Sequence, residues 1–181
     1  KRLIPGRVKR AILPTVRLHR ARNFQERSEL FNLMVRDFKL AEQPGGPNTE
    51  KDGKHISRSL KISTAEAALI LIDVWADHPV KGWQARADEN VRKKLRPLVK
   101  KMRENGVLVV HSPHGEEIHP LVKPTNNDII IDDPDEQVHL NEILKERGIR
   151  YLFYGGYASN MCILGRPTGI FEVAKRGYEI I

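Results

Sequence analysis

The chain has 181 residues, a formal net charge of +8 and a single cysteine, Cys162. This length suffices for one domain with a sizeable core plus an appendage. One cysteine excludes an internal disulfide framework and fits a reducing compartment, so we predict a cytoplasmic protein. No apolar run approaches the roughly 20 residues that a membrane-spanning helix needs, so we predict no membrane partner.

The positive charge is concentrated at the start of the chain. Residues 1–22 hold eight Lys and Arg and no acid, whereas residues 23–181 hold 23 cations and 23 anions. Pro5, Gly6 and Pro14 interrupt any regular pattern, so residues 1–29 are predicted to form an extended or partly disordered basic arm. The arm could bind nucleic acid or an anionic surface, or it could be a solvated tail or a segment exchanged between subunits. A nucleic-acid partner is disfavoured because residues 1–22 contain no aromatic side chain for base stacking.

Residues 30–64 are predicted to form a hairpin-like extension. LFNLMVRDFKL at 30–40 and HISRSLKIS at 55–63 both alternate apolar and polar residues, as expected of strands. Between them, the PGGP sequence is incompatible with a helix or a strand ladder. The second strand could therefore return antiparallel to the first.

From residue 65 onward the pattern is that of an α/β domain, which we assign to residues 65–181. Five apolar strands are expected, at 67–74, 107–112, 128–132, 151–156 and from Tyr178 to the chain end. Three helices are expected between them, at 87–106 with a kink at Pro97, at 136–147 ending before Gly148, and from about 161 to 176. This order predicts a mostly parallel, doubly wound sheet with helices on both faces. Such a sheet normally continues into another helix, so we expect the domain to be truncated at the C-terminus.

In an open α/β sheet, ligands bind at the carboxyl ends of the strands. The polar or glycine residues at these ends are Asp73, His111 and Ser112, Asp132 and Asp133, and Gly155 and Gly156, the last pair leading to Cys162. Asp73 and Cys162 should therefore share one rim of the sheet. A thiol at the first turn of a helix is favoured as the thiolate, and a carboxylate partly removed from water suits proton transfer near neutrality. Alternatively, Cys162 is a small buried hydrophobe and Asp73 caps a loop or pairs with a cation.

Several of these segments together resemble one protein family. ALILIDVW, VLVVHSP, the DIIID strand and GGYASNMCIL are similar to the isochorismatase-like cysteine hydrolases, which include nicotinamidases and N-carbamoyl amide hydrolases. The resemblance covers about residues 65–181, and its most specific part is G-x-A-[ST]-x-x-C, at residues 156–162. It implies that Cys162 is the nucleophile and Asp73 the general base. It also implies an oxyanion hole made by the backbone N–H groups of Ala158 and Cys162, and a cis peptide bond between Tyr157 and Ala158.

The chain departs from this family at one position. Family members have a lysine after the third strand, whereas this chain reads IIIDDPDE and has Asp133 at about that place. The nearest cation upstream is Lys123, on the loop that enters the strand. A catalytically inactive domain that serves as a binding or oligomerisation module therefore stays open as the alternative function.

The remaining site candidates lie on loops and at strand ends. HSPHGEEIH at 111–119 offers three histidines that could ligate zinc, but the Asp-x-His spacing of nicotinamidases is absent, so we expect no metal and no cofactor. Of the three, His111 is the best candidate for lining a pocket. Trp75 and Tyr157 could form aromatic pocket walls or pack in the core. Arg166, just before Pro167, could offer its charge to a substrate carboxylate or to an acid of another subunit.

The sequence thus predicts a hydrolase that cleaves an amide-type C–N bond of a small molecule through a cysteine nucleophile with an Asp general base. We further expect the chain to form a homo-oligomer.

Overall fold

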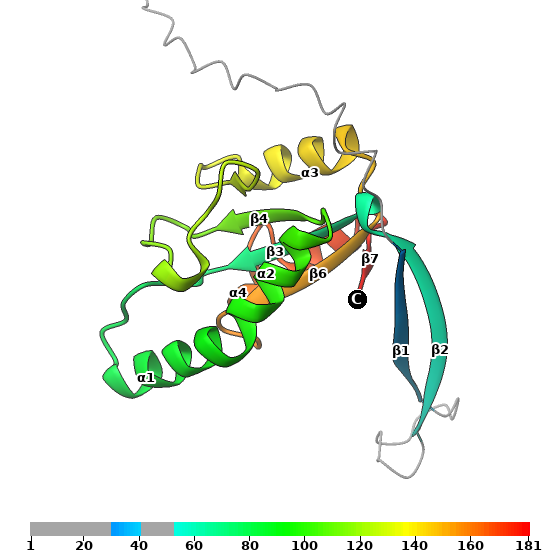
Figure 1. Ribbon diagram of the computed structural model, residues 1–181, viewed down its shortest axis with the longest axis horizontal. Helices are drawn as coiled ribbons and strands as arrows, with labels where there is room; N and C mark the ends of the chain where they lie inside the picture. Colours follow the sequence, from blue (N-terminus) through cyan, green and yellow to red (C-terminus); the bar gives the residue numbers. More distant parts are fainter. Residues whose placement is uncertain (1–29, 41–52) are drawn as a thin grey trace, which may run out of the picture.

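The computed structural model describes residues 30–40 and 53–181 and has two separate sheets (Figure 1). The basic arm predicted at 1–29 and the loop at 41–52 lie outside the described residues. Strands β1 (Leu30–Leu40) and β2 (Gly53–Ser63) pair antiparallel, from Leu30 opposite Ser63 to Leu40 opposite Gly53. The predicted N-terminal hairpin is therefore confirmed. It extends away from the rest of the molecule in Figure 1.

The second sheet has five strands, all parallel, in the order β5-β4-β3-β6-β7. They are β3 (Ala67–Ile72), β4 (Leu108–Ser112), β5 (Ile129–Ile130), β6 (Tyr151–Gly156) and β7 (Glu179–Ile180). The predicted doubly wound parallel sheet is confirmed. The strand order reverses between the neighbours β3 and β6, and in such sheets the crevice at this switch point is where ligands bind. Asp73 follows β3 and Cys162 follows β6, so both border this crevice.

Helices cover both faces of the sheet. One face carries α1 (Lys81–Asn90), the π-helical segment η5 (Val91–Leu95) and α2 (Arg96–Glu104). The other carries α3 (Glu136–Glu146), α4 (Cys162–Gly165) and α5 (Ile170–Ala174). Two short 3-10 turns, η4 (Thr64–Glu66) and η6 (Pro120–Val122), precede β3 and β5. No helix in the described parts of the chain is both long and apolar enough to cross a membrane.

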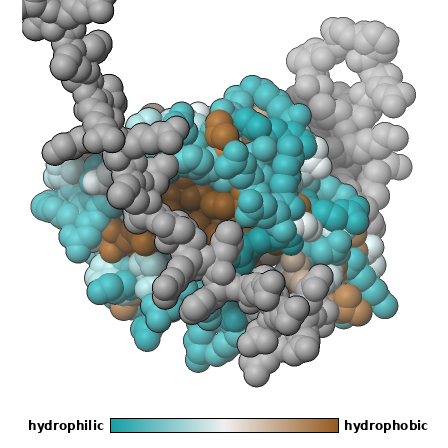
Figure 2. All heavy atoms as spheres, turned by 90° about the horizontal axis from the view of Figure 1, so that it is seen from above, coloured by the Kyte–Doolittle hydropathy of each residue, from teal (hydrophilic) through white to brown (hydrophobic). Residues whose placement is uncertain are grey.

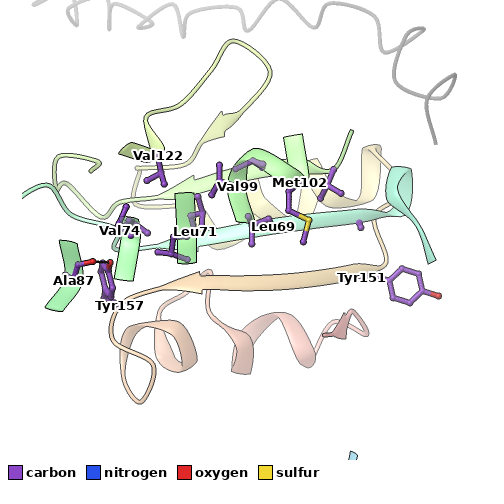
Figure 3. Packing of buried hydrophobic residues seen from close by; sticks show 14 of the residues in the cluster. Leu69, Leu71, Val74, Ala87, Val99, Met102, Val122, Tyr151 and Tyr157 are labelled. Atoms are coloured by element: carbon purple, nitrogen blue, oxygen red, sulfur yellow. Dashed lines mark hydrogen bonds between the residues drawn. The ribbon is translucent and has the colours of Figure 1, made fainter. Parts of the chain in front are cut away.

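The domain has two hydrophobic cores, one on each face of the sheet. They follow from the central strand β3, whose successive side chains point to opposite faces. All six of its residues are buried: Leu69 and Leu71 face the α1–α2 side, and Ile70 and Ile72 face the α3–α5 side. Figure 3 shows Leu69 and Leu71 together with Val99 and Met102 of α2. Each fully buried side chain of this size stabilises the fold by about 1.5–3 kcal/mol. Strand β3 is thus packed against side chains on both of its faces. This packing also fixes the position of Asp73, the residue that follows the strand.

The helix predicted at 87–106 begins earlier than expected and is interrupted in its middle. Helix α1 starts at Lys81, and the π-helical segment η5 lies directly before α2, in which Pro97 is the second residue. A proline ring clashes with the preceding helical turn and cannot donate a backbone hydrogen bond. The wider π-turn before Pro97 accommodates this disturbance, so the irregularity that the sequence predicts takes the form of a π-bulge.

The single helix predicted from about 161 to 176 is wrong. The structure has two short helices there, α4 and α5, because the chain leaves the helical conformation at Arg166, which is extended with φ −63° and ψ 157°. The residue before a proline is disfavoured in the helical region, and here that proline is Pro167. Cys162 therefore begins a helix of only four residues, whose few aligned peptides supply little of the macrodipole expected from a long helix.

Gly156, at the end of β6, is a position at which a mutation can test whether β6 and β3 must approach each other closely. A Cβ atom there would lie 1.8 Å from the carbonyl oxygen of Ile72, and its φ of +130° disfavours any side chain. We expect Gly156→Ala to lower the free energy of unfolding by about 3 kcal/mol or more, measured by urea denaturation. The matched control is Gly82→Ala in α1, where a Cβ meets nothing within 4 Å and should be neutral or stabilising. Equal stabilities of the two variants would contradict this prediction.

Candidate active site

Asp73 lies just beyond β3 in an unusual backbone conformation. Its φ is +49°, in the left-handed region that Asp tolerates better than most residues, and its N–H donates to the carbonyl oxygen of Ser112 at 3.1 Å. The residue is only 2% exposed. Strained backbone and a buried carboxylate together are typical of functional sites rather than of ordinary loops.

Both oxygens of Asp73 contact basic side chains. Oδ1 faces Nδ1 of His114, and Oδ2 accepts hydrogen bonds from Nε and Nη2 of Arg166, each at 3.1 Å. His114 comes from the loop after β4 and also has a left-handed φ, of +53°. Arg166 comes from the extended segment after α4. The carboxylate is thus held by two segments that follow two different strands of the sheet.

A second buried carboxylate, Glu136 at the start of α3, extends this cluster. Nε2 of His114 lies 3.1 Å from Glu136 Oε1. A neutral imidazole carries one N–H, and both ring nitrogens of His114 face carboxylate oxygens. Both contacts are hydrogen bonds only if the ring is an imidazolium or if one carboxyl is protonated. The hydroxyl of Ser112 donates to Glu136 Oε2 at 3.4 Å and pairs with the hydroxyl of Thr168 at 2.8 Å.

Cys162 is half-buried at the first position of α4. Burial acts to lower the pKa of Arg166, but the charge and hydrogen bonds of Asp73 and then of Cys162 outweigh it, so the pKa of the guanidinium is raised. The backbone N–H of Arg166 donates to the carbonyl oxygen of Cys162 at 3.0 Å, so the residue that pairs with Asp73 directly follows the short helix that Cys162 begins.

The turn between β6 and α4 presents backbone N–H groups beside the thiol. The peptide bond between Tyr157 and Ala158 is cis, as the resemblance implies. The carbonyl oxygen of Ala158 accepts from the N–H groups of Met161 at 3.1 Å and Ile163 at 3.2 Å. Within residues 30–40 and 53–181, the N–H groups of Ala158 and Cys162 donate to no acceptor.

Aromatic rings stack along the α1 side of the same rim. The ring centroid of Trp75 lies 4.5 Å from that of Tyr157 and 4.8 Å from that of His78, which is 5.2 Å from Trp83. The Tyr157 hydroxyl donates to the carbonyl oxygen of Ala87 at 2.7 Å, and burial raises its pKa. Figure 3 shows this contact between Tyr157 and Ala87. The stack thus runs from the core at Tyr157 to Trp83, which is 54% exposed.

Three other sequence candidates make their contacts elsewhere. His111 is buried, and its Nε2 lies 3.3 Å from Asp128 Oδ2. Asp133 contacts the ring of His139 at 3.0 Å. Lys123 is exposed, and its carbonyl oxygen accepts from Arg103 near the end of α2. In the part of the chain that the structure describes, none of the three contacts Asp73 or Cys162.

The three histidines between 111 and 119 do not converge on one point. His111 faces Asp128, His114 faces Asp73 and Glu136, and His119 lies 3.2 Å from Asp88. No group of three or more His, Cys, Asp or Glu side chains among the described residues is arranged to hold a metal ion.

Sequence reasoning did not connect His114, Glu136 or Arg166 with Asp73. The Arg-Pro pair at 166–167 was a usable signal for the end of the helix, since the residue before a proline is disfavoured in the helical region. Glu136 offered no such signal, because nothing in its neighbourhood distinguishes it from other acids in a first helical turn.

Comparisons with known proteins identify the fold. No protein-family model matches the chain, and no curated protein matches it. Among solved structures, a cysteine hydrolase from Pseudomonas syringae pv. phaseolicola has a TM-score of 0.55 at 16% identity and covers 66% of this chain and 70% of its own. An isochorismatase from Pseudomonas putida has a TM-score of 0.51 at 22% identity, with coverages of 65% and 68%.

A third similar structure is an isochorismatase-family protein from Desulfovibrio vulgaris, with a TM-score of 0.52 at 19% identity and coverages of 64% and 77%. These likenesses define the class of fold. The chain has the α/β fold of isochorismatase-family cysteine hydrolases, as its sequence motifs predict. In this chain the N-terminal β1–β2 hairpin forms a separate two-stranded sheet.

Asp128 contacts His111 of β4. The free energy of unfolding should therefore depend on pH over the range in which Asp128 titrates. Burial acts to raise the pKa of Asp128, but hydrogen bonds from His111, Arg103 and the N–H of Thr125 lower it to about 2. A carboxyl whose folded pKa lies below its unfolded value of about 3.9 stabilises the fold above pH 4, and loses this contribution as the pH falls toward 2.

We therefore expect Asp128→Asn to lower the free energy of unfolding by about 3 kcal/mol at pH 7, because it leaves buried partners without their charge. The difference from wild type should shrink between pH 4 and pH 2, measured by urea denaturation. Glu104→Gln is the matched control, since Glu104 forms only an exposed ion pair with Lys100 at 3.7 Å and its loss should change little. A difference that does not depend on pH would contradict the assignment.

Proposed function

We propose that the chain is a cysteine hydrolase that cleaves an amide-type C–N bond of a small molecule through Cys162. The observation that carries this proposal is the buried carboxylate of Asp73, which follows β3, the strand paired with the strand β6 that leads to Cys162. The proposed nucleophile and the proposed general base thus follow the two neighbouring strands β6 and β3 at the switch point of the sheet. The likeness in fold to cysteine hydrolases supports the same reaction class.

The proposed reaction has two steps. Cys162 loses its proton to Asp73, and its sulfur attacks the carbonyl carbon of the substrate. Asp73 then passes this proton to the leaving nitrogen as the C–N bond breaks, which leaves a thioester on Cys162. A water molecule, deprotonated by Asp73, attacks the thioester, and the proton returns to the departing thiol.

The negative oxygen formed in each step needs hydrogen-bond donors. The N–H groups of Ala158 and Cys162 have no acceptor among the described residues, and both lie in the turn that carries the thiol. They suit the role of an oxyanion hole, which is usually the largest single contribution to such catalysis. Trp75 and Tyr157, stacked at 4.5 Å, are proposed to bound the substrate on the α1 side.

The alternative, a domain without catalysis that serves binding or assembly, is favoured by one observation. No lysine contacts Asp73 or Cys162 in the described structure, although the resemblance implies one. The two proposals predict different reactivities for the thiol of Cys162. A catalytic Cys162 should react rapidly with an alkylating reagent at neutral pH, whereas a packing residue should be inert.

The hydrolase proposal is tested by ammonia release from a panel of small amides, with nicotinamide and N-carbamoyl amino acids as the first probes. Cys162→Ala should abolish turnover of any substrate found, and Asp73→Asn should lower the rate by roughly 10²–10⁴-fold. Asp135→Asn, an exposed acid whose side chain makes no capping hydrogen bond at α3, is the matched control and should keep the wild-type rate. Undiminished turnover by the folded Cys162→Ala variant would contradict the proposed cysteine mechanism.

We also propose that the chain assembles as a homo-oligomer in the cytoplasm. The β1–β2 hairpin, whose residue Leu30 is 66% exposed, extends away from the body (Figure 1) and offers a surface for a second copy. On the face seen in Figure 2, a hydrophobic area also lies among mostly hydrophilic side chains. Light scattering of the intact chain should give a mass above that of one chain, and a monomer at all concentrations would contradict the assembly.

A further inference from the structure

We propose that Glu136 acts on the proposed general base Asp73 through His114, whose ring it holds as an imidazolium between the two carboxylates. This inference rests on the proposed function, because it concerns the proposed general base. It makes Glu136, at the start of α3, and His114, in the loop after β4, positioning residues for Asp73.

The ring of His114 lies between the carboxylates of Asp73 and Glu136. Its Nδ1 faces Asp73 Oδ1, and its Nε2 lies 3.1 Å from Oε1 and 3.0 Å from Oε2 of Glu136. The hydroxyl of Ser112 is a more distant neighbour of Nε2, at 3.4 Å. One imidazole thus connects the carboxylate that follows β3 with the carboxylate that begins α3, and each ring nitrogen has a carboxylate partner.

Hydrogen bonds in both of these contacts require a proton beyond the single N–H of a neutral ring. An imidazolium is a weaker acid than a carboxylic acid, by about two units in model peptides, so the ring is the favoured place for this proton. Two features favour the ionised form of Glu136. The hydroxyl of Ser112 donates to its Oε2 at 3.4 Å, and the residue lies in the first turn of the 11-residue helix α3, where the macrodipole favours an anion.

A count of charges supports the same assignment. The side chains of Asp73, Glu136 and His114 are 3%, 8% and 9% exposed, so little water screens them. The guanidinium of Arg166 pairs with Asp73 at 3.1 Å and is the one other charged side chain that contacts this cluster within the described part of the chain. Asp132, which accepts from the N–H of the residue after His114, is itself exposed. Two carboxylates, the guanidinium and an imidazolium sum to zero, whereas a neutral ring would leave one buried negative charge uncompensated.

The charged ring has a consequence for the proposed reaction. Asp73 can take the proton of the thiol only as an ionised carboxylate held in one orientation. A donor at each of its oxygens, His114 at Oδ1 and Arg166 at Oδ2, fixes that orientation. Glu136 does not touch the thiol or Asp73, so its effect on the reaction passes through the ring. Glu136→Gln separates charge from shape, because an amide at this position can still donate to an unprotonated Nε2.

The first test reads the protons on the ring and needs no substrate. Nitrogen-15 NMR of the intact chain, labelled on its histidine rings, distinguishes protonated from unprotonated ring nitrogens, and the His114 signals are those missing from His114→Gln. We expect two protonated nitrogens for His114 at pH 7.5 in wild type and one in Glu136→Gln. Glu146→Gln, which changes an exposed acid at the other end of α3, is the matched control and should keep the wild-type signals. An unprotonated nitrogen on His114 in wild type would overturn the inference.

The second test uses the ammonia-release assay once a substrate has been found. Glu136→Gln should lower kcat roughly tenfold or more and leave KM nearly unchanged, because it acts on the proposed general base and not on substrate binding. A folded Glu136→Gln variant with the wild-type kcat would overturn the positioning role and leave the hydrolase proposal standing. If Cys162→Ala instead keeps full turnover, the hydrolase mechanism fails and the positioning role fails with it, whatever the ring spectrum shows.

Glu136→Gln removes a buried charge and could fail to fold, which circular dichroism would show. In that case Glu136→Asp takes its place, since it keeps the charge but moves it away from Nε2 by the length of one methylene group. At pH 7.5 this variant should lose part of the Nε2 proton signal of His114 relative to wild type. A His114 spectrum identical to that of wild type would overturn the role of Glu136.

Discussion

The site is organised around a carboxylate that the fold buries. Asp73 follows a strand with no exposed residue and is itself 2% exposed, so its charge has almost no contact with water. An unpaired charge in such a place costs several kcal/mol, and the chain avoids this cost by bringing His114 and Arg166 to its two oxygens. The loop after β4 and the segment after α4 therefore converge on the end of β3.

A break in one helix links the backbone to the proposed chemistry. The chain leaves the helical conformation at Arg166, just before Pro167, and the guanidinium of Arg166 pairs with Asp73. The fold is that of isochorismatase-family proteins, but fold alone does not determine chemistry.

Much of the architecture was predictable because the parallel strands are local apolar runs. The strand expected at 151–156 is β6 itself, and the helix expected at 136–147 is α3 within one residue, ended by Gly148 with φ +65°. The helix expected from 161 to 176 was the main error, since the apolar pattern outweighed the proline in that prediction. It was also predictable that the strands before Asp73 and Cys162 end at the same edge of the sheet, because the carboxyl ends of parallel strands share an edge.

The sequence by itself thus determined the layers, the edge that carries the site, and which thiol and carboxylate lie there, since these depend on local hydrophobic patterns and on the topology of parallel sheets. Only the tertiary structure decided what neutralises Asp73. Its partners lie 41 and 93 positions further along the chain, and no local pattern relates residues at such separations. Which side chain meets a buried charge depends on where loops turn after several elements have packed, and that is a property of the folded chain as a whole.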